Sequence, residues 1–518
     1  LNGMKKKILA VLCTGMIAVL TLAGCGNRPL TGGSQPTDSQ KSQPENSEEV
    51  QSTEATSSDA PRVVMYYPLS GIQADQDMVA EKVREYVMDK LGIDLELQVN
   101  PISSYDDQMN LVVAGSEQID LALVWGENIA SFSAKGALYP MDGLIDEYGQ
   151  GIRESLGDYL NAGAINGVLY QTPVNRSMFY QGGVVLRKDI LEKYNIDISS
   201  ISSERDLDAV FETIKAGEPD MAMIQPENSG SAFIYSDFDS LGDGYGVLLD
   251  YGQNLEVVNY YATDEFKDLC VLHREWNQKG YISSDVLTNT ESAADLVKAG
   301  KLLGFYVTVG PGTEQDKSNQ CGRDMVMIPL RKPFTYTSKA NGFGWSILNN
   351  TKDPVSAMKV LNLLYSDADF LNLIDWGIEG VHYKMKEGSD RIITFADGVD
   401  AATSGYFHNW SFAFGDQLNA YFWDGTEEDF PDAVRSLNKS AIQSKAMGFA
   451  YEVTPVKNEY TAVANVDNQY SAALSLGCID PEENLPKFLE ALENAGIDKI
   501  ISEKQSQLDA WAEDSGVE

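Results

Sequence analysis

Aromatic side chains are concentrated in a few short segments of this sequence. Phe, Trp and Tyr make up 10% of the 518 residues, and residues 407–410 (Phe-His-Asn-Trp) and 421–424 (Tyr-Phe-Trp-Asp) are dense aromatic groups. Flat aromatic faces stack on the C–H surfaces of ring-shaped molecules, and carboxylate, amide and guanidinium groups bond their hydroxyls. The chemistry that these residue types favour is non-covalent capture of a polyhydroxylated ligand.

Some of these side chains have positions that favour a ligand contact over core packing. Trp125 directly follows an apolar segment, and Trp345 lies in a Gly-Phe-Gly-Trp segment, so we expect both to contact a ligand. Trp376, beside a predicted helix, is expected in the core. Glu379 can bind a ligand or cap backbone amides, and Trp410 fits either role. The full set of candidates is Asp75, Gln76, Trp125, Glu127, Tyr170, Arg176, Trp345, Glu379, Trp410 and Trp423.

Motifs for catalysis and metal binding do not appear in this sequence. The three histidines are far apart, and neither a Gly-x-Ser-x-Gly elbow nor a phosphate-binding loop is present. The segment that begins at Asp237 starts like a calcium loop but has Leu241 and Leu248 where oxygen ligands are needed. We therefore predict no cofactor, no metal and no enzymatic activity. A surface glycoside hydrolase is the alternative, and it would need two carboxylates ~5–10 Å apart.

The first residues carry an export signal. Read from Met4, three lysines precede an apolar segment that is too short to span a membrane, and Leu22-Ala23-Gly24-Cys25 follows. This ending resembles the lipobox of bacterial lipoproteins, which implies a signal peptide over residues 4–24 and a lipid-modified Cys25. Residues 25–61, rich in Ser, Gln, Thr, Pro and Glu, are predicted to be a disordered tether that keeps the folded part off the membrane.

The charge of the chain excludes some partners. It has 39 Lys+Arg and 77 Asp+Glu, which gives a formal charge of -38. Removal of residues 1–24, which contain three lysines and no acidic residue, makes the mature chain still more negative. Such an acidic chain repels nucleic acid and anionic lipid. Of the five cysteines, Cys270, Cys321 and Cys478 remain in the mature chain. They favour free thiols over a disulfide framework, although one bridge stays possible.

Strands and helices alternate from Arg62 onward. Apolar segments predict strands at 63–67, 95–99 and 119–124, and helical spacing predicts helices at 77–91 and 105–114. This order predicts a parallel sheet with helices on both faces and ligands beyond the carboxyl ends of its strands. The loops at 71–77 and 125–128 have that position. Further elements are predicted as strands at 182–187, 302–307 and 325–329 and helices at 189–194, 206–216, 353–364, 461–474, 481–495 and 498–512.

Several segments resemble the extracellular solute-binding proteins of bacterial carbohydrate ABC importers. They are residues 120–123 with 136–141, residues 166–173 (Asn-Gly-Val-Leu-Tyr-Gln-Thr-Pro), residues 342–347 with 351–354, and residues 480–485. Residues 376–383 (Trp-Gly-Ile-Glu-Gly-Val-His-Tyr), residues 454–459 and the tail at 495–511 are similar to a LipO-like subfamily with a C-terminal domain of unknown function. The resemblance covers roughly residues 62–512.

This resemblance implies an α/β, two-lobed, type II periplasmic-binding-protein-like fold with a hinge. Lobe 1 would comprise 62–176 and about 342–395, and lobe 2 would comprise 177–341 and about 396–518 with a helical C-terminal region. It also implies a carbohydrate ligand, captured by lobe closure and passed to permease subunits and their ATPase. We expect a monomer held on the outer membrane face by its lipid. A peptide or other non-sugar ligand is the alternative within this fold.

Overall fold

The structure is a computed structural model that describes residues 60–228, 237–408 and 410–517. The predicted signal peptide (residues 4–24), Cys25 and the predicted tether up to residue 59 lie outside the described residues. Within the described ranges, no helix is both long enough and apolar enough to cross a membrane.

Lobe 1 is built on a five-stranded sheet in the order β2-β1-β3-β14-β6. β1 pairs in parallel with β2 and β3, as predicted, whereas β14 pairs antiparallel with β3 and β6, so the sheet is mixed. From Val63 onward β1 is buried throughout, which fits a central strand. The strands are β1 (Arg62–Leu69), β2 (Asp94–Pro101), β3 (Leu121–Trp125), β6 (Thr172–Pro173) and β14 (Phe343–Ile347).

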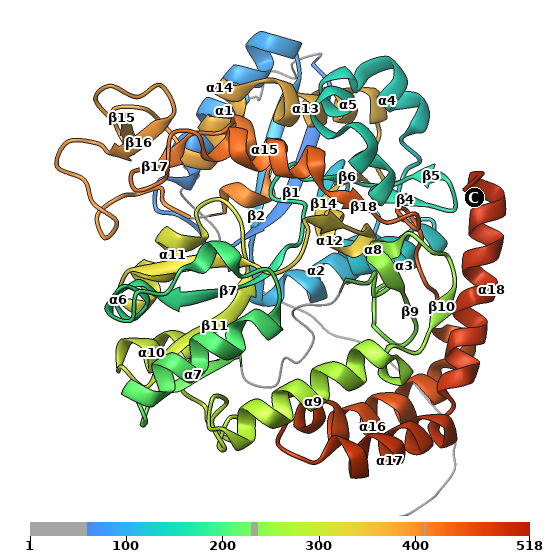
Figure 1. The fold of residues 1–518 in the computed structure, drawn as a ribbon. Coiled ribbons are helices and arrows are strands. Elements are labelled where there is room, and N and C mark those ends of the chain that lie inside the picture. Colours follow the sequence, from blue (N-terminus) through green and yellow to red (C-terminus); the bar gives the residue numbers. More distant parts are fainter. Residues whose placement is uncertain (1–59, 229–236, 409, 518) are drawn as a thin grey trace, which may run out of the picture. The chain divides into compact units, whose positions relative to one another are not determined.

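Helices surround this sheet and close the core of lobe 1 (Figure 1). Two boundaries follow from local chemistry: Gly92 ends the first helix in the left-handed conformation, and Asp353 caps the backbone N–H of Ser356 with Pro354 in the first turn. The helices are α1 (Gln76–Leu91), α2 (Ile102–Ala114), α3 (Ile129–Ala134), α4 (Asp142–Tyr148), α5 (Gln150–Leu156), α13 (Pro354–Ser366) and α14 (Ala368–Trp376).

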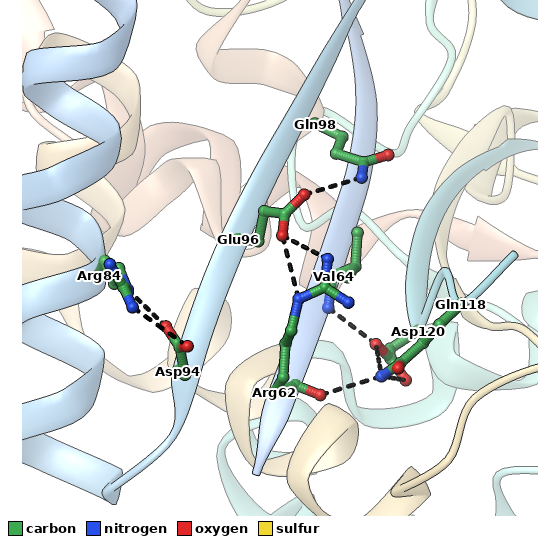
Figure 2. A network of polar contacts seen from close by, with 8 residues as sticks. All are labelled: Arg62, Val64, Arg84, Asp94, Glu96, Gln98, Gln118 and Asp120. Carbon is green, nitrogen blue, oxygen red and sulfur yellow. Dashed lines mark hydrogen bonds and ion pairs between the residues drawn. The ribbon is translucent and has the colours of Figure 1, made fainter. Parts of the chain in front are cut away.

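A buried carboxylate ties the strand ends of lobe 1 together. Asp120 is fully buried, and its Oδ2 accepts hydrogen bonds from the Val64 N–H at 2.8 Å and from Gln118 Nε2 at 3.0 Å. Gln118 also donates to the Arg62 carbonyl, and Arg62 pairs with Glu96 on β2 (Figure 2). The acidic residue that opens the 120–123 motif therefore fixes β1 beside β3 and does not bind a ligand.

Lobe 2 has a four-stranded mixed sheet in the order β12-β7-β11-β8. All six residues of β7 are buried, and β7 and β12 have the predicted bounds. The strands are β7 (Gly182–Arg187), β8 (Ala222–Pro226), β11 (Leu302–Thr308) and β12 (Met325–Pro329). Its helices are α6 (Lys188–Lys193), α7 (Leu207–Gly217), α9 (Asp264–Gln278), α10 (Ala293–Lys298) and α11 (Thr313–Cys321). Cys270, Cys321 and Cys478 are unpaired.

Short elements connect and extend the lobes. A helical turn, α12 (Thr337–Ala340), precedes the return of the chain into β14. The two-stranded ladders are β4 (Ala164–Ile165) with β5 (Val168–Leu169), β9 (Val247–Leu248) with β10 (Val257–Val258), and β13 (Phe334–Thr335) with β18 (Ile442–Gln443). A three-stranded sheet is formed by β15 (Tyr383–Met385), β16 (Ile392–Phe395) and β17 (Phe422–Trp423), and the remaining helices are α8 (Leu249–Gly252) and α15 (Phe430–Ser440).

Three helices form the C-terminal region: α16 (Lys457–Ser475), α17 (Pro481–Ala495) and α18 (Ile497–Ser515). α16 and α17 pack along α9, and Phe266 of α9 shares a core with Phe488 and Ile500 (Figure 1). The predicted boundary between the lobes at residue 395 differs from the observed packing, because Tyr406, Ala413 and Phe414 belong to the lobe 1 core.

Candidate ligand-binding site

A cavity of ≈ 560 Å³ lies at the carboxyl end of β3, and we call it the main cavity. The carboxyl ends of the strands are where α/β sheets bind ligands. The cavity receives one segment after β3, one from the crossing at α12, one from lobe 2 and one from the C-terminal region. Its lining includes Trp125, Gly126, Glu127, Asp239, Asp243, Ser338, Asn341, Gly342, Phe449, Tyr451 and Tyr460.

A larger cavity, ≈ 890 Å³, has none of the predicted ligand residues in its lining, which includes Glu154, Asp158, Asp416 and Arg435. A second cavity of ≈ 560 Å³ shares Ala130, Ile165, Phe449 and Ala450 with the main cavity and is lined by Tyr170. This second cavity, which we call the side cavity, therefore continues the space of the main cavity. The lining of the 890 Å³ cavity contains no tryptophan. We therefore regard the main and side cavities as the candidate site.

The loop after β3 is held tightly against the crossing. The Gly126 N–H donates to the Gly342 carbonyl at 3.1 Å, and a Cβ on Gly126 would lie 2.3 Å from the Asn341 carbonyl oxygen. Only glycine allows this approach. Trp125 is half-buried, and its indole Nε1 donates to Asp106 Oδ1 at 2.6 Å, which fixes the ring at the cavity edge. A rigid, partly exposed indole is suited to stacking on a sugar ring.

A chain of aromatic rings extends from Trp125. We call it the aromatic row: the ring centroids of Trp125 and Phe343 are 6.1 Å apart, those of Phe343 and Phe412 5.7 Å, and those of Phe412 and Trp410 5.1 Å. Phe412 is 37% exposed, an unusual state for such a large apolar ring. Trp125 and Trp410 were predicted as ligand residues from the sequence, whereas Phe343 and Phe412 were not. Phe343 pairs with Trp125 across β14 and β3, a register that only the tertiary structure gives.

Two cations, Arg176 and Lys339, lie near each other at the crossing. The Arg176 guanidinium lies 4.6 Å from the Phe343 ring centroid, and its buried Nε has no hydrogen-bond partner within the described ranges. Burial lowers the pKa of Arg176. The pKa of Lys339 falls to about 8, first because of burial and second because of repulsion from Arg176. The two positive charges therefore repel each other at the crossing.

The structure corrects the prediction for Trp345. Its side chain is fully buried, its indole N–H donates to the Ala413 carbonyl at 2.9 Å, and its ring packs beside Tyr67 and Phe414. It has no surface to offer a ligand and instead fills the core of lobe 1. Trp376 is 5% exposed, so its predicted core position is confirmed.

Six other candidates do not line the main or side cavity, and two of these, Arg176 and Trp410, contact rings of the aromatic row. Oδ2 of Asp75 lies 3.3 Å from His382 Nε2, and Gln76 is buried in lobe 1. Glu379 is exposed, so it does not act as a buried cap. Trp423 packs against Trp376 and neighbouring rings at the β15–β17 sheet. Of the ten candidates, the structure brings together Trp125, Glu127, Tyr170, Arg176 and Trp410.

Residues from distant parts of the chain complete the site. Asp243 reaches the main cavity from lobe 2, Phe449 and Tyr451 reach it from the segment before α16, and Tyr460 reaches it from α16. No local pattern marks these residues, because only the tertiary fold brings them to the end of β3. In the part of the chain that the structure describes, no cluster of three or more His, Cys, Asp or Glu could hold a metal ion.

Comparisons with known proteins agree with this architecture. Residues 73–369 match the family model "Bacterial extracellular solute-binding protein", and residues 445–513 match a domain of unknown function, DUF3502. The chain is 27% identical over 499 residues, 95% of each chain, to the "Carbohydrate ABC transporter substrate-binding protein" of Streptococcus pneumoniae.

Solved structures share the fold. The N-glycan transport solute binding protein (NgtS) of Streptococcus pneumoniae is similar with a TM-score of 0.75 at 24% identity, covering 88% of this chain and 100% of that chain. Its complex with Man5GlcNAc is similar with a TM-score of 0.59 over the same shares. An alginate-binding protein is similar with a TM-score of 0.55 at 17% identity, covering 87% of this chain and 99% of the other.

The solute-binding family model covers more than half of the chain and includes β3, the loop after it and the crossing into β14. Members of this family bind solutes outside the cell and do not catalyse reactions on them. The chain therefore belongs to the bacterial extracellular solute-binding proteins, with the DUF3502 domain at its C-terminal end.

Proposed function

We propose that this protein captures a neutral oligosaccharide in the main and side cavities and delivers it to the permease of an ABC importer. The observation that carries the proposal is the half-buried Trp125 at the cavity edge, continued by the aromatic row and faced by polar groups of lobe 2 and the C-terminal region. The carbohydrate importer relative, 27% identical over almost the whole chain, supports the ligand class.

Charge favours a neutral sugar over an acidic one. Three carboxylates, those of Glu127, Asp239 and Asp243, belong to the lining of the main cavity, and neither Lys nor Arg is among its described lining residues. Lys504 pairs with Asp243, but a uronate or sulfated glycan would still meet the other carboxylates there. Arg176 and Lys339 lie nearby in the crossing but outside this lining.

The combined volume favours more than one sugar ring. The main cavity and the side cavity hold ≈ 560 Å³ each and share four residues, so a chain can continue from Trp125 toward Tyr170. We propose that closure of the two lobes buries this ligand. Small-angle scattering with and without a bound glycan tests the closure, and an unchanged radius of gyration at saturation would contradict it.

The experiment for the ligand class is a thermal-shift panel on residues 60–518. Neutral glycans such as Man5GlcNAc and kestose are compared with alginate oligosaccharides and short peptides. A ligand at 100 times its Kd adds about 2.7 kcal/mol to the free energy of unfolding. Stabilisation by neutral glycans alone is expected, and a response only to peptides or to alginate oligosaccharides would contradict the proposal.

We also propose that Cys25 carries the lipid that holds the protein at the outer membrane face. The basic, apolar and small-residue order of residues 4–25 supports this assignment. In a Gram-positive host, Cys25→Ser is expected to move the protein from the membrane fraction to the medium. Retention in the membrane fraction would show that another segment anchors the chain.

A further inference from the structure

A loop of lobe 2, residues 239–248, forms one wall of the main cavity, and we call it the acidic loop. Its two carboxylates shape it locally: Asp239 Oδ1 accepts from the Leu241 N–H at 2.9 Å, and Asp243 Oδ1 accepts from the Tyr245 N–H at 2.8 Å. Leu241 has a φ of 49°, a conformation that non-glycine residues rarely adopt. The acidic loop thus needs support from outside itself to keep this shape.

That support comes from the C-terminal domain of unknown function. Lys504 of α18 is fully buried, and its Nζ donates to Asp243 Oδ1 at 2.6 Å and to the Gly246 carbonyl at 3.1 Å. The same Nζ lies 4.6 Å from the ring centroid of Tyr451. A buried ammonium group is costly unless it is paired, so these contacts hold α18, Asp243 and Tyr451 together as one unit.

Two further contacts fix the acidic loop and its neighbouring ladder to the same domain. The Tyr245 hydroxyl lies 3.3 Å from Asp467 Oδ2 on α16 and donates to it. Gln505, next to Lys504, accepts from the Val257 N–H at 2.7 Å and donates to the Leu255 carbonyl at 3.0 Å. The helices α16 and α18 therefore contact the acidic loop and its neighbouring ladder at several points and keep them in place.

Two polar atoms at this wall lack a partner. Asp243 Oδ2 and the Tyr451 hydroxyl are buried, and neither has a hydrogen-bond partner within the described ranges. The Asp243 side chain is only 10% exposed, and both residues line the main cavity. Buried polar atoms are normally hydrogen-bonded, and a carboxylate oxygen beside a phenol is a ready partner for hydroxyl groups.

We propose that the C-terminal domain is a working part of the ligand site: Lys504 orients Asp243, so that Asp243 Oδ2 and the Tyr451 hydroxyl form a subsite for the hydroxyl groups of a sugar. This inference rests on the proposed function, because it assigns a subsite within the same cavity. Asp243 and Tyr451 contact the ligand, whereas Lys504 is a positioning residue. The domain thereby contributes to affinity as well as to the fold of lobe 2.

Lys504→Met tests the positioning role without a ligand. Hydrogen–deuterium exchange should be faster at the amides of Leu241 and Tyr245, whereas exchange in the lobe 1 sheet should not change. The matched control is Lys499→Met on the same helix, where an exposed lysine pairs with Glu459 at 3.0 Å. Unchanged exchange in the acidic loop of Lys504→Met would overturn the positioning role.

Tyr451→Phe tests the subsite and keeps the ring beside Lys504. Calorimetry with Man5GlcNAc should show about a 5- to 10-fold weaker Kd for Tyr451→Phe, as expected for one lost hydrogen bond, and at least a 10-fold weaker Kd for Lys504→Met. Lys499→Met should match the unmodified protein. An unchanged Kd for Tyr451→Phe would overturn the subsite, and this variant decides alone if Lys504→Met does not fold.

The two proposals fail in different ways. If neither Man5GlcNAc nor any other neutral glycan of the panel binds the unmodified protein, the proposed ligand class and the sugar subsite fall together. The exchange experiment still decides whether Lys504 holds the acidic loop. If neutral glycans bind and Tyr451→Phe binds them equally well, only the subsite is wrong.

Discussion

Replacing Trp125 and Trp345 one at a time separates the ligand site from the core. The two indoles differ in environment: Trp125 is half-buried at the main cavity, and Trp345 is fully buried in lobe 1. Trp125→Ala should weaken glycan binding while leaving the fold intact. Trp345→Ala should lower stability without a direct effect on the ligand.

The magnitudes follow from burial. Truncation of a central aromatic contact in a binding site typically costs about 2 kcal/mol or more, which corresponds to roughly a 30-fold weaker Kd. Truncation of a buried tryptophan costs about 3–5 kcal/mol of unfolding free energy. Loss of the Trp345 indole also leaves the Ala413 carbonyl without its donor, which adds about 1–3 kcal/mol.

Calorimetry and urea unfolding followed by circular dichroism measure the two effects. For Trp125→Ala we expect a weaker Kd with an unchanged urea midpoint, and for Trp345→Ala a lower midpoint with a near-normal Kd for the folded fraction. A normal Kd for Trp125→Ala would show that glycans bind elsewhere. Loss of binding by a fully folded Trp345→Ala would restore Trp345 to the ligand site.

Further predictions concern buried charges and glycine positions. Asp375 is fully buried with no hydrogen-bond partner for either oxygen among the described residues, and burial raises its pKa well above 3.8. The unmodified protein therefore loses stability as pH rises above about 3.8 through the folded-state pKa. In urea unfolding at several pH values, Asp375→Asn should not show this loss of stability, and near pH 3 it should be as stable as the unmodified protein. The same dependence of stability on pH in both proteins would contradict a protonated, buried Asp375. Because the pKa of Lys339 is lowered to about 8, stability should rise between pH 8 and 10.5, and Lys339→Met should flatten that rise in thermal melts. Gly126→Ala should weaken glycan binding because its Cβ would meet the Asn341 carbonyl, whereas Gly143→Ala in α4, where a Cβ meets nothing within 4 Å, should bind normally and melt slightly higher. Equal glycan affinities of the two alanine variants would show that the loop after β3 tolerates displacement.

Periodicity was sufficient to predict most elements of both lobes. β7, β12 and α17 have the predicted bounds, and β1, α1 and α2 differ only at their ends, because long apolar patterns and clear breakers define them. The mixed pairing of β14 was not predictable from the order of elements. Strand direction at that position depends on a crossing from lobe 2, which no local pattern encodes.

The candidate site was less predictable than the fold. Phe343 and Trp345 are two residues apart in β14, so alternation places them on the same face of the sheet. It does not give their depth: Phe343 pairs with Trp125 at the cavity end, whereas Trp345 pairs with Leu123 inside the sheet. Asp243 and Tyr451 meet through Lys504, more than fifty residues beyond either of them, and only tertiary structure brings these three side chains together.

The position of β14 between β3 and β6 has a consequence for the order of folding. Residues up to 176 contain four strands of the lobe 1 sheet but not the one that joins β3 to β6. During synthesis, lobe 1 cannot complete its sheet until residue 347 has left the ribosome, by which time the whole lobe 2 sheet is available. Pairings across such sequence separations form slowly. The nascent chain therefore spends an extended period with an incomplete lobe 1 sheet, in which the edges of β3 and β6 that β14 later joins are unpaired with it.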